Sequence, residues 1–314
     1  MNFQQLRSVR EAIRHDFNLT ETAEVLHASQ SAVSRQIREL EDELGIEIFH
    51  RYGKRLTGLT TPGREIAGII ERILKDRESL KKASEQYRGF DHGSLSVAAT
   101  HAQIRYRLPD VVLGFRERFP QVSLSLQQCA PGQILELLRG GSVELGFLPS
   151  GLTGNAELVQ FEAYRWSHRI VAPVGHPLLA LEAPGLVDIA RYPVITFEEG
   201  MVGRARINEA FRAQGVEPNV IISAVDSDVI KTYVELGLGV GIIAERAYNP
   251  AVDRKIAMLE GTDLIPPITT NIAVRRGAYL RDYAVAFIQS VVPGLGAQRI
   301  HDRIHGGPAE LIAA

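Results

Sequence analysis

The chain has 314 residues, of which 45% are hydrophobic and 23% charged, and its formal net charge is −2. This length allows about two domains that each bury a core, and the near balance of charge gives no overall sign of nucleic-acid binding. No run of 18 apolar residues predicts a membrane span, and the N-terminal stretch lacks the apolar core of a signal peptide. The single cysteine, Cys129, rules out an intramolecular disulfide, so a cytoplasmic location is expected.

The first 45 residues predict three short helices. A helix over residues 3–17 follows from apolar residues spaced three to four apart, and a second helix covers TETAEVLH with Thr20 or Thr22 as its cap. Ser29 is the expected N-cap of the third helix, which Gly45 ends. The inner stripe of this third helix is expected to be Val33, Ile37, Leu40 and Leu44. Two short helices joined by a tight turn are typical of a helix-turn-helix.

The stretch IEIFHRYGKRLTGLT after the third helix predicts a β-hairpin, or wing. Its apolar residues nearly alternate on both sides of Tyr-Gly-Lys. Between Arg51 and Arg64 there are four basic residues and no acidic one, which is a positive patch that the overall charge conceals.

A long helix is predicted from Thr61, its expected cap, to about Tyr87, with Pro62 at the first helical position. Apolar side chains recur along it in a seven-residue pattern, at Ile66, Ile70, Ile73, Leu80 and Tyr87. We expect this seam to pair with a second copy of the helix. The alternative is a single helix that packs on its own winged domain.

From about residue 94 strands and helices alternate, which predicts an α/β domain with a mostly parallel sheet. One helix is expected over RYRLPDVVLGFRERF, and the chain after Pro293 is expected to be poorly ordered. The predicted organisation is a winged helix-turn-helix over residues 1–60, a linker helix over 61–88, a hinge over 89–93, an effector domain over 94–300 and a tail over 301–314.

The polar face at the start of the third helix has the side chains that read DNA bases. Gln30, Ser31, Ser34 and Arg35 project together there, and these residue types bond to base edges in the major groove. Arg38, one turn on, is assigned to phosphate, and Arg51, Lys54 and Arg55 of the wing to phosphate or the minor groove. A solvated polar face is the alternative. The acidic run from Glu39 to Glu43 is expected to point away from DNA.

The segment AEVLHASQSAVSRQIRELEDELGIEIFHR, followed by LTGLTTPG, resembles the N-terminal domain of LysR-type transcriptional regulators. The order of winged helix-turn-helix, linker helix and two-lobed effector domain is similar along the whole chain. The resemblance implies a double-stranded DNA operator, a small-molecule effector and a homodimer or homotetramer. It leaves contact with RNA polymerase, and activation against repression, open.

Within that family, residues 1–290 resemble the CysB and Cbl group, through MNFQQLR, FHRYGKRLT and AVDSDVIKTYVELGLGVGIIA among other segments. Members of that group control sulfur assimilation and sense sulfate or acetylserine-type metabolites. The resemblance implies an effector domain with a periplasmic-binding-protein fold, whose second lobe covers roughly residues 166–266. The effector would bind in a cleft between the two lobes.

The strand SLSVAAT is expected to deliver Thr100, His101, Ala102 and Gln103 to a helix N-terminus, which is a natural anion site. Thr100, Gln103 and Trp166 match pocket residues of the group, although Thr100 could simply cap the helix. Three positions depart from the group, because Ala102, Pro149 and Val202 stand where it has hydroxyl residues. Each missing hydrogen bond to a desolvated oxyanion costs about 1–3 kcal/mol. An organosulfur compound or another small carboxylate is therefore expected in place of sulfate.

The sequence predicts no catalytic residues, no metal site and no cofactor apart from the effector. Asp226 or Ser227 is expected to cap a helix, and the glycines at 237, 239 and 241 follow that helix, so they do not form a dinucleotide-binding loop. Cys129 is interpreted as a small buried side chain. Two alternatives stay open: an α/β enzyme or solute-binding protein tethered to a helix-turn-helix, and a LysR-type regulator of another pathway.

Overall fold

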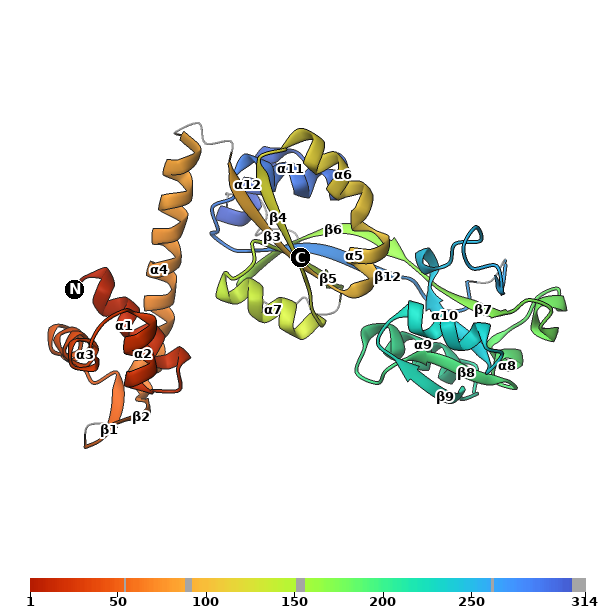
Figure 1. Cartoon of the computed structure of the whole chain (residues 1–314), viewed down its shortest axis with the longest axis horizontal. Helices are drawn as coiled ribbons and strands as arrows, with labels where there is room; N and C mark the ends of the chain where they lie inside the picture. Colours follow the sequence, from red (N-terminus) through yellow and green to blue (C-terminus); the bar gives the residue numbers. More distant parts are fainter. Residues whose placement is uncertain (54, 88–91, 151–155, 261–262, 307–314) are drawn as a thin grey trace. The chain divides into compact units, whose positions relative to one another are not determined.

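The computed structural model describes residues 1–53, 55–87, 92–150, 156–260 and 263–306. The chain forms two compact units, Met1–Gly89 and Phe90–Ala314 (Figure 1). In the described part of the chain, no helix combines the length and the hydropathy that crossing a bilayer requires.

The first unit is a three-helix domain with a hairpin and a long helix. Its elements are α1 (Phe3–Arg14), α2 (Leu19–Val25), α3 (Gln30–Leu44), β1 (Phe49–Tyr52), β2 (Arg55–Leu59) and α4 (Thr61–Tyr87). The hairpin and α3 lie where the sequence predicted them. The expected bounds of the first two helices were wrong. Helix α1 ends at Arg14 because Asp16 and Phe17 adopt positive φ values of 48° and 65°. The cap of α2 is Asn18, whose side chain accepts from two backbone N–H groups, and not Thr20 or Thr22.

Helix α3 has the predicted ends. The Ser29 hydroxyl accepts a hydrogen bond from the Ala32 N–H at 3.2 Å, and Gly45 closes the helix with a φ of 67°. Val33, Ile37 and Leu40 are fully buried, but Leu44 is 39% exposed. The prediction of a buried Leu44 was wrong because the helix ends at this residue, and Glu41 is buried instead.

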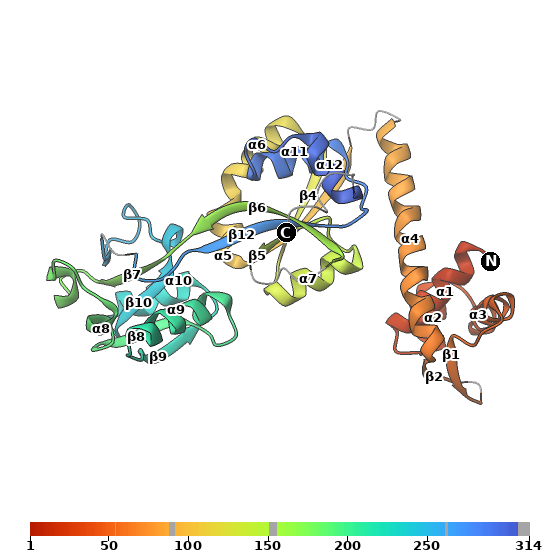
Figure 2. The same ribbon diagram turned by 180° about the vertical axis from the view of Figure 1, so that it is seen from behind.

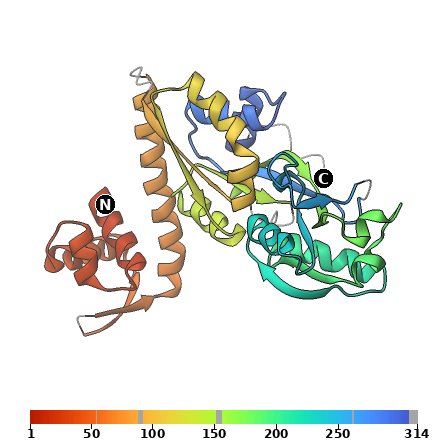
Figure 3. The same cartoon turned by 45° about the vertical axis from the view of Figure 1, so that its right-hand side comes forward.

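Helix α4 is continuous from Thr61 to Tyr87 in every view (Figures 1–3). Its cap is Thr60 and not Thr61, since the Thr60 hydroxyl accepts from the Gly63 N–H at 2.9 Å. The close approach of α4 to the hairpin requires glycine at position 63, because a Cβ there would lie 2.0 Å from the Ile48 carbonyl oxygen.

The apolar seam of α4 divides into two parts. Ile70 is buried in the core of its own domain, and Ile66 and Ile73 are partly buried against that core. The expectation that this seam pairs with a second copy of the helix was therefore wrong for the first half of α4, which packs on its own winged domain instead. Leu80 is 73% exposed and stays available to a partner. The side chain of Tyr87 lies outside the described residues.

The second unit has two lobes, each built on a five-stranded sheet. The first sheet has the order β4-β3-β5-β12-β6 and the second β11-β7-β10-β8-β9. The strands are β3 (Gly93–Ala99), β4 (Val122–Gln128), β5 (Leu145–Pro149), β6 (Leu158–Trp166), β7 (His168–Pro173), β8 (Pro193–Phe197), β9 (Asn219–Ala224), β10 (Val240–Ala244), β11 (Ile256–Met258) and β12 (Ile268–Arg275).

Helices cover these sheets. They are α5 (His101–Tyr106), α6 (Leu108–Arg118), α7 (Pro131–Gly140), α8 (Leu186–Ile189), α9 (Val202–Ala213), α10 (Ser227–Glu235), α11 (Asp282–Val291) and α12 (Ala297–His305), with two short 3-10 turns, η1 (Pro177–Ala180) and η2 (Glu245–Ala247). In the first lobe, α6, α11 and α12 pack on one face of the sheet and α7 on the other (Figures 1 and 2).

The sheets are mixed, which corrects the prediction of a mostly parallel sheet. Strand β12 runs antiparallel to β5 and β6, and β7 runs antiparallel to β10 and β11. The cause is the double crossing between the lobes: β6 leads into β7, and β12 brings the chain back (Figure 1). A strand that returns from the other lobe enters its sheet from the opposite end. The sequence prediction missed β6, β8 and β11.

Two further expectations were wrong. The single helix expected over RYRLPDVVLGFRERF is two helices, α5 and α6, which meet at Arg107 ahead of Pro109. The expectation of poor order after Pro293 was wrong for Ala297–His305, because these residues form α12 and bury Ile300 and Ile304 completely. Residues 307–314 of the expected tail lie outside the described residues.

Candidate functional site

The start of α3 presents the polar side chains that the sequence assigned to DNA. Gln30, Ser31, Arg35 and Arg38 are exposed and Ser34 is half-buried. Arg35 lies 3.5 Å from Glu39 in an ion pair, but its side chain is 75% exposed, so the pair is weak. The Arg35 guanidinium therefore remains able to reach a base or a phosphate.

The C-terminal half of α3 is held by other parts of the domain. The Gln5 amide donates to Glu39 at 3.2 Å, and the Ser8 hydroxyl donates to Gln36 at 2.5 Å, so α1 holds this half of the helix. Glu43 pairs with the N-terminal amino group of Met1. Glu39 and Glu43 thus make intramolecular contacts, while the start of the helix stays open to solvent.

Glu41 joins α3 to the wing. Its buried carboxylate accepts from the backbone N–H groups of Ile48 and Phe49, at 2.9 and 3.1 Å, and pairs with Arg51 at 2.5 Å. Arg51, predicted to contact phosphate or the minor groove, therefore has a structural partner within the domain. Sequence reasoning missed this role of Glu41, although its position four residues after Ile37 places it on the buried face.

The other two wing residues with a predicted DNA contact are Lys54 and Arg55. Arg55 is exposed at the start of β2. Lys54 lies outside the described residues.

At the junction of the two lobes, a chain of polar contacts starts at α5. Thr100 is the N-cap of this helix, and its N–H donates to the Gln103 side-chain oxygen at 2.8 Å. Gln103 and Thr270 lie against the hydroxyl of Tyr164, whose pKa is raised to about 12 by burial. The Trp166 indole N–H donates to the Thr270 hydroxyl at 3.2 Å. These contacts link α5 to the two crossing strands, β6 and β12.

The remaining predicted effector residues, Ala102, Pro149 and Val202, lie on three different elements. Pro149 is buried and stands opposite Thr270 in the β5–β12 pairing, and Ala102 is half-buried on α5. Val202 is the first residue of α9, in the second lobe. None of these three side chains offers a hydrogen bond.

The sequence prediction missed three residues at the junction: Tyr164, Thr270 and His168. Tyr164 could have been found, because it lies two residues before Trp166 on the same face of a strand. The ring of His168 lies 4.8 Å from that of Trp166, which connects the crossing strands to the second lobe.

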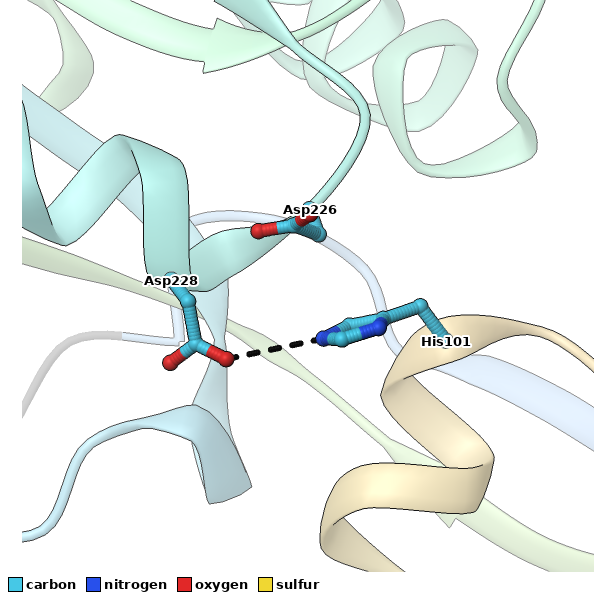
Figure 4. Close-up of side chains that lie close together, drawn as sticks. All are labelled: His101, Asp226 and Asp228. Carbon is cyan, nitrogen blue, oxygen red and sulfur yellow. Dashed lines mark ion pairs between the residues drawn. The ribbon is translucent and has the colours of Figure 1, made fainter. Parts of the chain in front are cut away.

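His101 is not part of the polar contacts that start at Thr100. Its side chain contacts the second lobe instead. Its Nε2 lies 3.5 Å from an oxygen of Asp228 on α10 (Figure 4). The Nε of Arg105 lies 3.8 Å from the same oxygen. Lys231 pairs with the other oxygen of Asp228 at 3.3 Å. Burial opposes the ionisation of Asp228, but the Tyr106 hydroxyl, Lys231 and His101 outweigh it, so the pKa of Asp228 lies below its ordinary value.

His101, Asp226 and Asp228 also have the donor types of a metal site, with ligand atoms within 4.8 Å of one another. Asp226, however, caps α10 as predicted, since it accepts from the Val229 N–H at 2.9 Å. Because the cationic side chains of Arg105 and Lys231 already balance Asp228, a cation is not needed to explain the cluster.

A separate groove of about 420 Å³ lies along β9 and α10. It is lined by Glu198, Ile222, Ser223, Ala224, Val225, Val229 and Tyr233. It includes none of the residues predicted to bind the effector.

Family models match both units of the chain. Residues 3–64 match the bacterial regulatory helix-turn-helix protein of the lysR family, and residues 88–295 match the LysR substrate binding domain. The second match alone covers more than half of the chain.

Curated relatives and a solved structure agree with these matches. The chain is 47% identical to the HTH-type transcriptional regulator SsuR of Burkholderia cenocepacia, over 96% of this chain and 97% of the relative. It is 44% identical to the regulator CysB of the same species, over 98% of both chains. It also resembles the crystal structure of the cofactor-binding domain of the Cbl transcriptional regulator, at 38% identity and a TM-score of 0.65, over 68% of this chain and 93% of that one.

Proposed function

This chain belongs to the LysR family of transcriptional regulators, and we propose that the first two turns of α3 read its operator while an effector at the junction of the two lobes controls the response. The observation that supports the DNA part is the division of α3. Its start is polar and exposed, whereas Val33, Ile37 and Leu40 anchor its other face in the domain. Helix-turn-helix dimers read two half-sites about one helical turn of DNA apart, or a multiple of that.

The genes under control are proposed to belong to sulfur metabolism. The support is the likeness of the whole chain to the CysB, Cbl and SsuR regulators. Like other regulators of its family, the protein would act in the cytoplasm as a homo-oligomer, and the effector would be its only small-molecule partner. Contact with RNA polymerase is part of the same proposal.

The effector is proposed to be an organosulfur acid or a small carboxylate. Ala102, Pro149 and Val202 give no hydroxyl to a sulfate ion, and the aromatic ring of Trp166 suits an apolar portion of a ligand. The second candidate is a regulator of another pathway with a carboxylate effector. The lack of hydroxyl groups at Ala102, Pro149 and Val202 supports it equally.

The experiment has two parts. The full chain is incubated with a random duplex library, and the captured DNA is sequenced; we expect an interrupted dyad. A thermal-shift screen of the full chain against sulfur metabolites and small carboxylates then seeks the effector, because a ligand that binds only the folded state raises its melting temperature. Capture of DNA without any shared motif would contradict the operator assignment, and a clear shift with sulfate alone would contradict the effector class.

A further inference from the structure

Helix α5 is too short to hold its own position. It has six residues, His101–Tyr106, and an isolated helix of this length is not stable in water, so contacts with other elements must fix it. Gln103 is buried and lies against the Tyr164 hydroxyl of the first lobe. Tyr106 packs against the core of the second lobe. The position of this helix therefore depends on both lobes.

Five polar side chains form a row that crosses from the second lobe to the first at α5. Asp253, buried in the second lobe, accepts from the Lys231 ammonium at 3.1 Å. Lys231 also pairs with Asp228 at 3.3 Å, and the other oxygen of Asp228 lies 3.5 Å from the Nε2 of His101. The Nδ1 of His101 lies 3.3 Å from the side-chain oxygen of Gln128, at the end of β4. This interlobe row joins the core of one lobe to an edge strand of the other.

The second-lobe end of the interlobe row is held firmly. The side chain of Lys231 is 12% exposed, and its ammonium also donates to the Ala247 carbonyl at 2.8 Å. Asp253 accepts from the Asn249 N–H at 2.7 Å as well. Buried charges that are paired and hydrogen-bonded in this way have a fixed geometry. Lys231 therefore holds the Asp228 carboxylate at the surface of its lobe, facing α5.

The contact between the two lobes is the weaker part of the interlobe row. The side chains of His101 and Asp228 are 28% and 41% exposed, so water can replace either partner. Arg105 lies 3.8 Å from the same oxygen of Asp228, but its side chain is 65% exposed, so it contributes less. Because Lys231 has other partners in its own lobe, a break between His101 and Asp228 leaves the rest of the row intact.

We propose that Asp228 is a positioning residue of the effector site: through His101 it holds α5 on the second lobe, and so keeps Thr100 and Gln103 in place while the lobes are closed. In the closed state α5 lies against α10, and in the open state the two helices separate. The two crossings of the chain, β6 to β7 and back at β12, are where a hinge motion would take place. That Thr100 and Gln103 meet an effector rests on the proposed function, whereas closure rests on the interlobe row alone.

The test is the distribution of distances between the lobes, measured in the full chain by double electron–electron resonance of two nitroxide labels. The labels are attached at Glu136→Cys, exposed on α7 of the first lobe, and at Ala213→Cys, exposed on α9 of the second. Cys129→Ser removes the single native thiol. Subunits are exchanged with an excess of unlabelled protein, so that distances between subunits do not contribute. No effector is added, so the measurement reports the interlobe row itself.

Asp228→Ala should shift the ratio of closed to open lobes about ten-fold towards the open state, the worth of one charged hydrogen bond. His101→Ala removes the same contact from the other lobe and should have a similar effect. The double variant should be no more open than either single variant, because both remove one interaction. Asp228→Glu keeps the carboxylate and should stay within about three-fold of the wild type.

Asp188→Asn is the matched control, since Asp188 lies in the first turn of α8 in the same lobe but pairs with Arg191 of that lobe. It should leave the distances unchanged. An unchanged distribution for either Asp228→Ala or His101→Ala, or effects that add in the double variant, would overturn the proposal. Operator selection by the wild type separates the two levels: a selected motif together with unchanged distances refutes only the role of Asp228, whereas absence of a motif refutes the proposed function itself.

Discussion

Burial lowers the pKa of His168 to about 4, well below the 6.5 of an exposed histidine. In the unfolded chain the ring takes up a proton as the pH falls through 6.5, while in the folded chain it stays neutral down to about pH 4. The unfolded state therefore binds more protons in this window, and the free energy of unfolding decreases as the pH falls from 7 towards 4. Above pH 7 the histidine contributes no pH dependence.

Between pH 7 and pH 5 we expect this residue to remove about 2 kcal/mol from the free energy of unfolding of the second unit. Trp166 is the only tryptophan of the chain and lies against His168, so its fluorescence reports the unfolding of this unit. Urea titrations of the wild type, His168→Phe and His176→Phe at both pH values isolate the contribution. An equal loss for the wild type and His168→Phe would show that other groups carry the pH dependence.

At the scale of single residues, sequence reasoning predicted the exposed side of α3 but not the partners of buried polar groups. The apolar spacing identified Val33, Ile37 and Leu40 correctly. It could not identify Glu41 as the link to the wing, because its acceptor role depends on backbone N–H groups that the hairpin brings to it. His168 was left without a role for the same reason, since its neighbours come from α9 and β8.

At the scale of elements, two glycines of α4 give a matched pair of substitutions. Gly63→Ala would place a Cβ 2.0 Å from the Ile48 carbonyl oxygen, and backbone atoms on both sides would have to move. We expect a loss of about 2–4 kcal/mol in the free energy of unfolding of the first unit. Gly68→Ala meets only the end of the Arg72 side chain, at 3.9 Å, and should stabilise the helix by about 0.5–1 kcal/mol.

Guanidinium unfolding of the full chain, followed by the helical circular dichroism signal, measures both changes. If Gly63→Ala were as stable as Gly68→Ala, the close approach of α4 to the hairpin would be wrong.

Most elements with a strong local period were predictable, namely α3, the hairpin, α4 and, in the second unit, α7, α9, α10 and α11. Strand β6 was not, because its residues alternate between buried and exposed only over part of its length as it passes from one lobe to the next. The antiparallel direction of β12 also could not be predicted. It depends on the passage of the chain between the two lobes, and the local sequence of β12 does not show that passage.

At the scale of the whole molecule, the function requires oligomers, because LysR regulators bind their operators as oligomers. Leu80, 73% exposed on α4, is expected to lie in the subunit contact. Leu80→Glu should lower the oligomeric state at micromolar concentration without changing the stability of the first unit. Ile70→Ala, in contrast, should destabilise that unit by about 2–5 kcal/mol, because Ile70 is buried in its core.

Sedimentation velocity measures the first effect and guanidinium unfolding the second. An unchanged sedimentation coefficient for Leu80→Glu would remove this residue from the subunit contact. The two-unit organisation itself followed from the sequence, through the change from helical spacing to alternating strands and helices near residue 94. Which parts of the α4 seam remain exposed did not follow, because that depends on how the winged domain covers the helix.

Operator reading by the start of α3 can be measured as one ratio of affinities. The affinity for the selected operator is divided by the affinity for random duplex DNA of the same length, at one moderate salt concentration, by fluorescence anisotropy. Arg35→Ala is expected to lower this ratio by about ten-fold or more, the worth of one lost base contact, whereas Arg72→Ala, exposed on α4, should leave it unchanged. An unchanged ratio for Arg35→Ala, with both affinities reduced equally, would assign Arg35 to phosphate and rule out base reading by this side chain.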